Sequence, residues 1–183
     1  FMMEVAKKFL NQSKDYKWIF TTSASELRSN DQFIVDKLKQ LSKENNRFII
    51  KTNMDKKDYY ELLSKAKIQF NSALQDYVSF TLLEATTFDC DICYPRFKSF
   101  PECVPSDRLY DPFDVDSALK VLTSIEYGMP SLRSSHRNIP KLSSLGTYLD
   151  AYIINNGIDR EVNIWNESEY YTEFLKSKNI IGD

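Results

Sequence analysis

The strongest constraint on the fold is a regular alternation of short apolar runs with amphipathic stretches along the first 126 residues. Each run has the length and composition of a β-strand, and each is followed by apolar side chains at helical spacing. The runs cover residues 18–22, 48–50, 68–71 and 91–94. Strands that alternate with helices pair in parallel, so the pattern predicts an α/β protein whose parallel sheet carries helices on both faces.

The expected helices cover residues 2–13, 31–43, 55–66, 80–87 and 114–126. In the second of them Asn30 can supply the N-terminal cap, and the inward stripe is expected to be Phe33, Ile34, Leu38 and Leu41. Residues 131–146 are polar and aperiodic, which indicates a long connection before further helices at 147–155 and 167–178. We therefore expect an α/β domain over 1–126, followed by a connection and C-terminal helices over 127–183.

Composition excludes several classes of protein. Hydrophobic residues make up 42% of the chain, which is typical of an ordered globular protein rather than a tail. The 24 Lys and Arg are balanced by 26 Asp and Glu. The sequence therefore has no basic patch of the kind that a dedicated nucleic-acid binder carries. No apolar run approaches the roughly 18 residues of a membrane span and no signal pattern is present, so we expect a cytoplasmic protein without a transmembrane segment.

The three cysteines, Cys90, Cys93 and Cys103, are expected to be free thiols in a reducing compartment. The pair Cys90 and Cys93 could form half of a zinc or redox site, but the chain has no second pair and a single His, so we expect no metal. The opening Phe1-Met2-Met3 suggests a piece of a longer polypeptide.

The stretch from residue 68 to 104 carries the most functional information. It combines a strand, a loop, a helix, a second strand and a second loop, an arrangement that places a helix N-terminus where α/β proteins bind phosphorylated ligands. Asp76 lies in the loop before the helix, and Glu84 lies eight positions later inside it. The two carboxylates are expected to lie around one anion-sized gap, and the hypothesis is that this gap holds a nucleotide-sugar.

Residues 59–104 resemble the carboxyl-terminal domain of retaining glycosyltransferases of the GT-B fold, the group 1 type. Asn71-Ser72 matches the strand exit, Asp76 and Glu84-Ala85 match a pair of acidic positions, and Pro101-Glu102 matches the end of the motif. Residues 18–23, 47–53 and 109–112 resemble neighbouring segments, so the likeness covers about 1–126. It implies one Rossmann-like half of a GT-B fold that lacks its first strand and the amino-terminal domain, which binds the acceptor.

The resemblance also implies the site and the reaction. The family transfers a hexose from a UDP- or GDP-sugar with retention and without a metal or other cofactor, so Asp76 and Glu84 would be the catalytic pair. Asp76 would accept hydrogen bonds from the transferred sugar and Glu84 from the ribose. Thr52, Asn53 and Met54 would face the base and Ser23 the phosphates. The start of the helix would contribute Tyr77, Val78, Ser79, Phe80, Thr81 and Leu82.

Four departures from the family pattern leave a second interpretation open. Ser79 and Asp89 replace glycines, Asp91 replaces a proline, and Asp76 replaces a Glu and is one methylene shorter. A displacement of about 1 Å can cost on the order of 100-fold in rate. Moreover, Ser79 is a good helix cap, and the helix dipole stabilises a Glu near a helix N-terminus without any ligand. The alternative is therefore a catalytically degenerate GT-B domain that serves as an interaction module.

Overall fold

Strands and helices alternate along the part of the chain that the computed structural model describes, residues 1–74 and 79–129. The prediction of a mixed α/β protein with parallel strands is thus confirmed. The elements are α1 (Met2–Gln12), β1 (Trp18–Thr21), α2 (Gln32–Glu44), β2 (Phe48–Lys51), α3 (Lys56–Leu63), β3 (Ile68–Phe70), α4 (Phe80–Thr87), β4 (Asp91–Pro95), α5 (Phe100–Cys103), the 3₁₀ turn η1 (Ser106–Arg108), β5 (Leu109–Tyr110) and α6 (Val115–Glu126).

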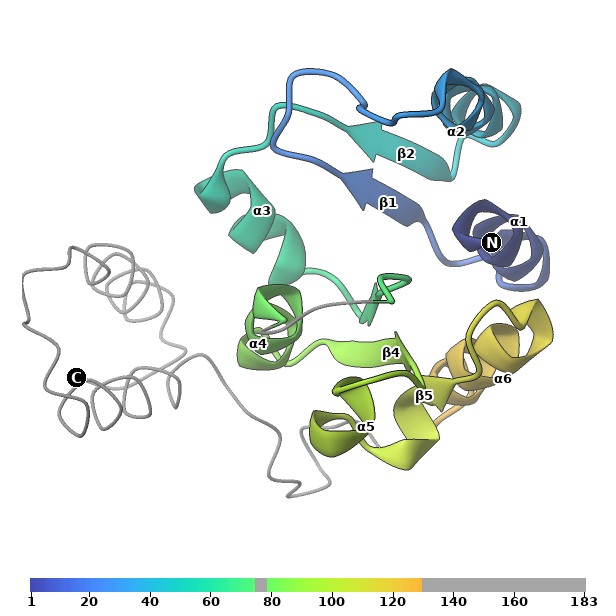
Figure 1. Cartoon of the computed structure of the whole chain (residues 1–183), viewed down its shortest axis with the longest axis vertical. Helices are drawn as coiled ribbons and strands as arrows, with labels where there is room; N and C mark the ends of the chain where they lie inside the picture. Colours follow the sequence, from blue (N-terminus) through green and yellow to red (C-terminus); the bar gives the residue numbers. More distant parts are fainter. Residues whose placement is uncertain (75–78, 130–183) are drawn as a thin grey trace, which may run out of the picture. The chain divides into compact units, whose positions relative to one another are not determined.

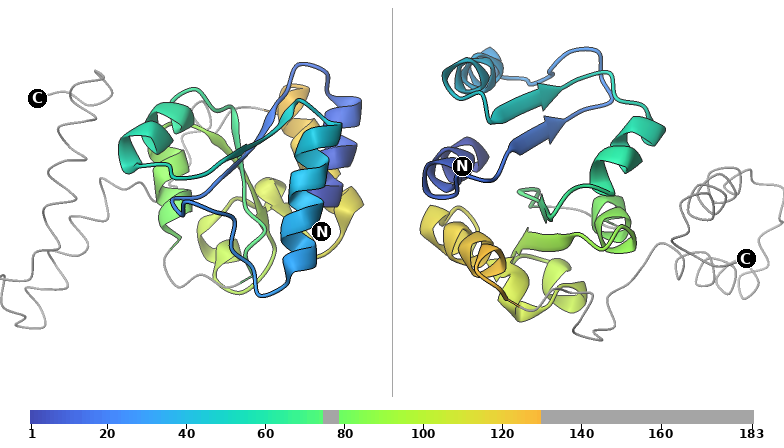
Figure 2. Two further views of the ribbon diagram at one scale, coloured as in Figure 1. Left: turned by 90° about the horizontal axis from the view of Figure 1, so that it is seen from above. Right: turned by 180° about the vertical axis from the view of Figure 1, so that it is seen from behind.

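The described strands form two small parallel sheets. One contains β1 and β2, with Trp18 opposite Phe48, and the other has the order β3-β4-β5, with Ile68 opposite Asp91. Helices α1, α2 and α6 lie on one side of the strands and α3 and α4 on the other (Figures 1 and 2). Only β4 among the described strands is paired on both edges and buried at every residue.

Helix α1 contributes to two hydrophobic cores through neighbouring stripes of its surface. Val5 and Phe9 pack with residues of β4, β5 and α6, whereas Ala6 and Leu10 pack with residues of α2 and β2. The spacing of these four residues places them on adjoining faces of one helix. Since the two sheets share no strand pairing, α1 links them through side-chain packing.

The carboxyl end of α1 is capped from a distance by Arg47, which directly precedes β2. Its guanidinium donates hydrogen bonds to the carbonyl oxygens of Leu10, Ser13 and Lys14, the latter two at 2.7 and 3.1 Å. The last carbonyls of a helix have no partner within the helix, and a cation there also interacts favourably with the helix dipole. Arg47 therefore ties the end of α1 to the start of β2.

A buried ion pair connects β4 with the η1 turn. Arg108 is fully buried, and its Nη2 donates to Oδ1 of Asp91 at 3.0 Å, while Nη1 lies 3.6 Å from a carboxylate oxygen of Asp107. Asp91 is the position at which the family resemblance would place a proline. The carboxylate at this position therefore has a structural partner in Arg108.

The inward face of α2 differs from the expected one. Val35, Leu38 and Leu41 are buried, whereas Phe33 is 62% and Ile34 39% exposed. Either stripe has helical spacing, and the contact with α1 decides which one is buried. The cap also moves by one residue, because Asp31 rather than Asn30 accepts a hydrogen bond from the Phe33 amide.

Several expectations fall on positions that the structure does not describe. They are the loop residues Asp76, Tyr77 and Val78, and the connection and helices expected after residue 129. The second domain, expected over 127–183, falls almost wholly in that part. Within the described ranges, no helix has the length and apolar character that crossing a membrane requires.

We expect Arg108→Met to lower the free energy of unfolding by about 3–5 kcal/mol, because it leaves the Asp91 carboxylate buried without its cation. The matched control is Lys65→Met, which removes an exposed pair with Glu61 and should cost less than about 1 kcal/mol. Urea denaturation of both variants measures the difference. Equal costs would show that the buried pair contributes no more than a surface pair.

Candidate functional site

The loops that follow β1 and β2 are joined at the carboxyl ends of these strands. The Asn53 amide donates to the Ala24 carbonyl at 2.8 Å, and the Met54 amide donates to the Thr22 carbonyl at 3.2 Å. Asn53 adopts a left-handed conformation with φ of 53°, which Asn tolerates better than most residues. The structure thereby brings the expected phosphate loop with Ser23 next to the expected base loop.

The N-terminus of α4 carries a cluster of neutral hydrogen-bonding groups. Ser79 caps the helix by accepting from the Leu82 amide at 3.4 Å. The hydroxyl of Thr81 lies 3.2 Å from that of Ser79, 3.4 Å from that of Tyr94, and 3.5 Å from Nδ2 of Asn71. In the described part of the chain, the amides of Phe80 and Thr81 have no acceptor, as is usual for the first residues of a helix.

Glu84 lies in the second turn of α4 and points towards α3. It is buried, with 4% of its surface exposed. Its Oε1 accepts hydrogen bonds from Nζ of Lys56 at 2.7 Å and from the hydroxyl of Tyr60 at 3.1 Å. Both bonds fall on Oε1, and no residue that the structure describes donates to Oε2. One carboxylate oxygen is therefore fixed by α3, and the other is left as an acceptor.

The pKa values around Glu84 follow from burial and from the charge of its carboxylate. Burial alone would lower the pKa of Lys56, but the hydrogen bond and charge of Glu84 outweigh it, and the pKa is raised. The ammonium also lies 5.4 Å from the centre of the Tyr60 ring, within range of a cation–π contact. The pKa of Tyr59 is raised by burial and by the charge of Glu84. Lys56 therefore stays protonated and Tyr59 neutral well above neutral pH.

The predicted site residues that the structure describes fall into two groups, the joined loops with residues 23 and 52–54 and the helix α4 with residues 79–84. Lys56, two residues after the base loop, connects the two groups through its bond to Glu84. Phe80 is 57% exposed, whereas the side chain of Leu82 is buried and its amide is used by the Ser79 cap. Leu82 is therefore a packing residue at this site. Asp76, Tyr77 and Val78 lie outside the described residues.

Two contributors to this site, Lys56 and Tyr60, did not emerge from the sequence. They are four positions apart on α3, and residues at this spacing share one face of a helix. Their common face is turned towards Glu84. The spacing was a usable signal, but which side of α3 faces α4 is decided by packing, here by the Tyr60 ring against Phe88 at 5.5 Å.

The three cysteines are free thiols, as the sequence predicted. Cys90 and Cys93 are buried, and burial followed by the charges of Asp89 and Asp91 raises the pKa of Cys90 to about 12. Burial also raises the pKa of Cys93 and, to a smaller extent, that of Cys103. Residues 1–74 and 79–129 contain no group of three or more His, Cys, Asp or Glu side chains arranged to hold a metal ion.

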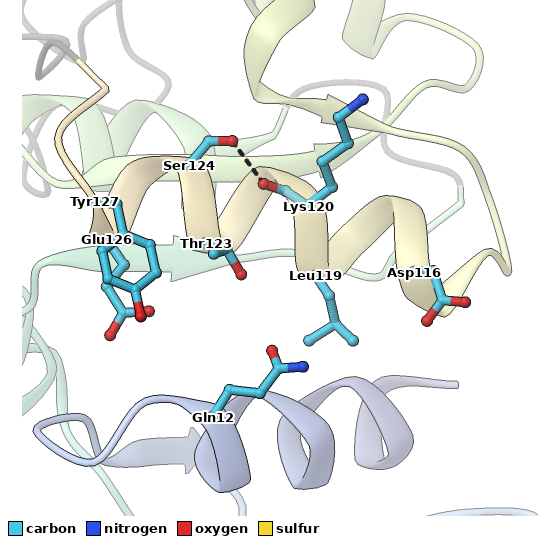
Figure 3. Close-up of a pocket in the computed structure, with 8 residues that line it drawn as sticks. All are labelled: Gln12, Asp116, Leu119, Lys120, Thr123, Ser124, Glu126 and Tyr127. Atoms are coloured by element: carbon cyan, nitrogen blue, oxygen red, sulfur yellow. Dashed lines mark hydrogen bonds between the residues drawn. The ribbon is translucent and has the colours of Figure 1, made fainter.

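A shallow pocket lies between α1 and α6 (Figure 3). Its carboxylates are already engaged, because Asp116 pairs with Lys8 at 3.3 Å and Glu126 accepts from the Ser13 hydroxyl. The remaining lining is Gln12, Leu119, Lys120, Thr123, Ser124 and Tyr127. Since its acidic groups serve to join the two helices, we do not assign a ligand to this pocket.

Two comparisons with known proteins found no match. No protein-family model matches the chain, and a search of curated proteins finds no similar sequence.

We expect Lys56→Met to cost about 1 kcal/mol of stability at neutral pH, since it removes a charged hydrogen bond that is partly screened by solvent. The pKa of Lys56 is raised above 10.5 in the folded chain, so this stabilisation is present below pH 10.5 and is lost as the pH rises through the folded value. Urea denaturation at neutral and high pH tests both statements. Lys57→Met, at the exposed neighbouring position, should change neither the stability at neutral pH nor its dependence on pH. An equal loss of stability in Lys57→Met would contradict the stabilising role of the bond between Lys56 and Glu84.

Alkylation with iodoacetamide under native conditions should modify Cys103 first. The thiolate is the reactive species, and burial combined with raised pKa values protects Cys90 and Cys93. Mass spectrometry of the intact chain should show one modification in buffer and three in urea. Modification of Cys93 at the rate of Cys103 would contradict the burial of β4.

Proposed function

We propose that this chain is the nucleotide-sugar donor-binding domain of a GT-B glycosyltransferase, with the Rossmann-like sheet and two-faced helical cover of that domain. The single observation that carries the proposal is the state of Glu84. Its Oε1 is held by Lys56 and Tyr60, while Oε2 accepts from no described residue. A carboxylate oriented in this way is suited to accept a hydrogen bond from a ribose hydroxyl.

The position of the site supports the same interpretation. In open α/β sheets, ligands bind outside the carboxyl ends of the strands. The loops after β1 and β2 are joined there, and the N-terminus of α4 follows β3. Ser23, Thr52 and Asn53 are exposed in these loops and could contact the base and phosphates.

The chemistry follows from the groups that are present. As the glycosidic bond breaks, negative charge grows on the departing diphosphate, and donors already oriented towards it lower the barrier. The amides of Phe80 and Thr81 and the hydroxyl of Ser79 would be such donors in this proposal, aided by the dipole of α4. Asp76, in the preceding loop, would accept from the transferred hexose.

One observation favours the second candidate, a GT-B-like domain that acts as an interaction module. The Glu84 side chain is only 5% exposed and is held by Lys56, so the same network also stabilises the fold without any ligand. In this alternative the contact between α3 and α4 persists for structural reasons, and the fold presents a surface to another protein. The two candidates differ in whether nucleotide binding depends on Glu84.

We expect calorimetric titration of the full chain with UDP, GDP and ADP to detect weak binding of at least one nucleotide, on the order of 1 mM, which equals about −4 kcal/mol. Glu84→Gln should weaken binding by about 10-fold or more, because a hydrogen bond to a charged group is lost. The matched control is Glu44→Gln, which changes an exposed Glu on α2 and should leave binding unchanged.

If none of the three nucleotides gives a binding signal while circular dichroism shows a folded chain, the donor-binding proposal is overturned. Equal binding by the parent and Glu84→Gln would remove Glu84 from the site and favour the interaction module. Asp76→Ala separates sugar from nucleotide, because it should weaken a UDP- or GDP-sugar while leaving the free nucleotide unaffected.

A further inference from the structure

Phe113 presents an aromatic ring to solvent just beyond the carboxyl end of β5. It is the third residue after the strand, and 69% of its surface is exposed. Its backbone is left-handed, with φ of 62°. Among the described residues other than glycine that have a positive φ, Phe113 alone is aromatic. This conformation is unfavourable for a bulky side chain, so the ring is held in its position at a cost in stability.

A tight turn imposes the conformation. The Asp111 carbonyl accepts from the Asp114 amide at 3.1 Å, which closes a four-residue turn around Pro112 and Phe113. Proline at the second position with a positive φ at the third defines type II geometry, for which glycine is preferred at the third position. The Asp111 amide donates to the Ser117 hydroxyl at 2.9 Å, which anchors the turn to α6. The chain therefore places Phe where stability favours Gly.

Packing of the ring offsets little of this cost. The ring of Phe1 meets that of Phe113 edge-on, with centroids 6.2 Å apart, and most of Phe113 stays exposed. Tyr127 is similarly exposed, at 78%, but its φ is an ordinary −90° and needs no special account. Residues held in unfavourable backbone conformations cluster at ligand sites, where the strain serves to present a side chain. Phe113 therefore has the character of a ligand contact.

A chain of contacts connects Phe113 with the start of α4. The ring of Phe1 also stacks on that of Tyr110, with centroids 5.6 Å apart. The Tyr110 hydroxyl donates to the Asn71 carbonyl at 2.7 Å, and the Asn71 side chain lies 3.5 Å from the Thr81 hydroxyl. Since the carboxyl ends of parallel strands share one edge, the turn after β5 and the N-terminus of α4 border the same edge of the sheet β3-β4-β5.

Polar groups beside the ring indicate the chemistry of the ligand. Arg96 and Asp111 form a pair at 3.4 Å, and their side chains remain 46% and 66% exposed. A guanidinium donates hydrogen bonds and a carboxylate accepts them, so together they can bind hydroxyl groups. The exposed face of Phe113 can cover apolar C–H groups. A hexose combines both features, with hydroxyls around its rim and C–H groups on its faces, and ligand sites commonly pair an aromatic surface with a few polar groups.

We propose that Phe113 is a hexose-contacting residue, with Arg96 and Asp111 binding hydroxyls of the same sugar. This inference rests on the proposed function, in which the base lies at the loop after β2 and the ribose and diphosphate lie at α4. The strand order continues from β3 through β4 to β5. The part of the ligand beyond the diphosphate is therefore the part that meets Phe113, and the strained turn holds the ring out towards it.

Phe113→Gly separates this role from a structural one, because it removes the ring and relieves the strain together. The Tm of the full chain should stay equal to that of the parent or rise by up to about 4 °C. In calorimetric titrations, binding of UDP-glucose, UDP-galactose or GDP-mannose should weaken by about 5-fold or more. Binding of free UDP or GDP should stay unchanged, since neither carries the sugar.

Two further variants serve as controls for the ring. Phe113→Tyr keeps an aromatic ring at the turn and should keep the affinity for the nucleotide-sugars. Tyr127→Ala removes an exposed aromatic at the opposite end of α6 and should leave that affinity unchanged. Saturation-transfer NMR gives a direct measurement: irradiation of the aromatic protons should transfer signal to the hexose protons in the parent and in Tyr127→Ala, and the transfer should be lost in Phe113→Gly.

The results that would overturn the inference differ from those that would overturn the proposed function. If UDP or GDP binds but Phe113→Gly binds the nucleotide-sugars as tightly as the parent, Phe113 does not contact the sugar and the proposed function stands. If no nucleotide binds, both fail together. A Tm lowered by more than about 3 °C in Phe113→Gly would make the ring structural. A concentration-dependent dimer of the parent that Phe113→Gly abolishes would assign the ring to a second copy.

Discussion

Helix α1 is the element on which the arrangement of the described structure depends. Val5 and Phe9 belong to the core of β4, β5 and α6, and Ala6 and Leu10 belong to the core of α2 and β2. The two sheets share no hydrogen bonds between strands in the described part of the chain. On this side of the strands, the packing of one amphipathic helix therefore holds the two sheets together.

On the other side of the strands, the contact between α3 and α4 has the corresponding role. Helix α3 follows β2 of one sheet and α4 follows β3 of the other, so the bond from Lys56 to Glu84 and the packing of Tyr60 on Phe88 span both sheets. The candidate site is thus built from the same contact that joins the two halves. Any change in how the sheets meet would alter the geometry around Glu84.

Periodicity predicted the elements better than it predicted their surroundings. The helix expected at 80–87 has the observed bounds because Ser79 is a strong cap and apolar residues follow it at once. The prediction that Phe33 and Ile34 are buried was wrong. Two stripes of α2 have helical spacing, and the contact with α1 selects between them. β5 was missed because it has two residues. At the candidate site, Glu84 was predicted from its motif, whereas Lys56 and Tyr60 depend on a contact between helices that are distant in the sequence.

The cap that Arg47 provides has a consequence for the order of folding. The last carbonyls of α1 lie more than thirty residues from the side chain that satisfies them, and α1 has 11 residues, which is too short to be stable alone in water. The helix therefore gains its full stability only after β1, α2 and the loop before β2 have formed. As the chain emerges from a ribosome, α1 would remain a fluctuating segment until Arg47 arrives.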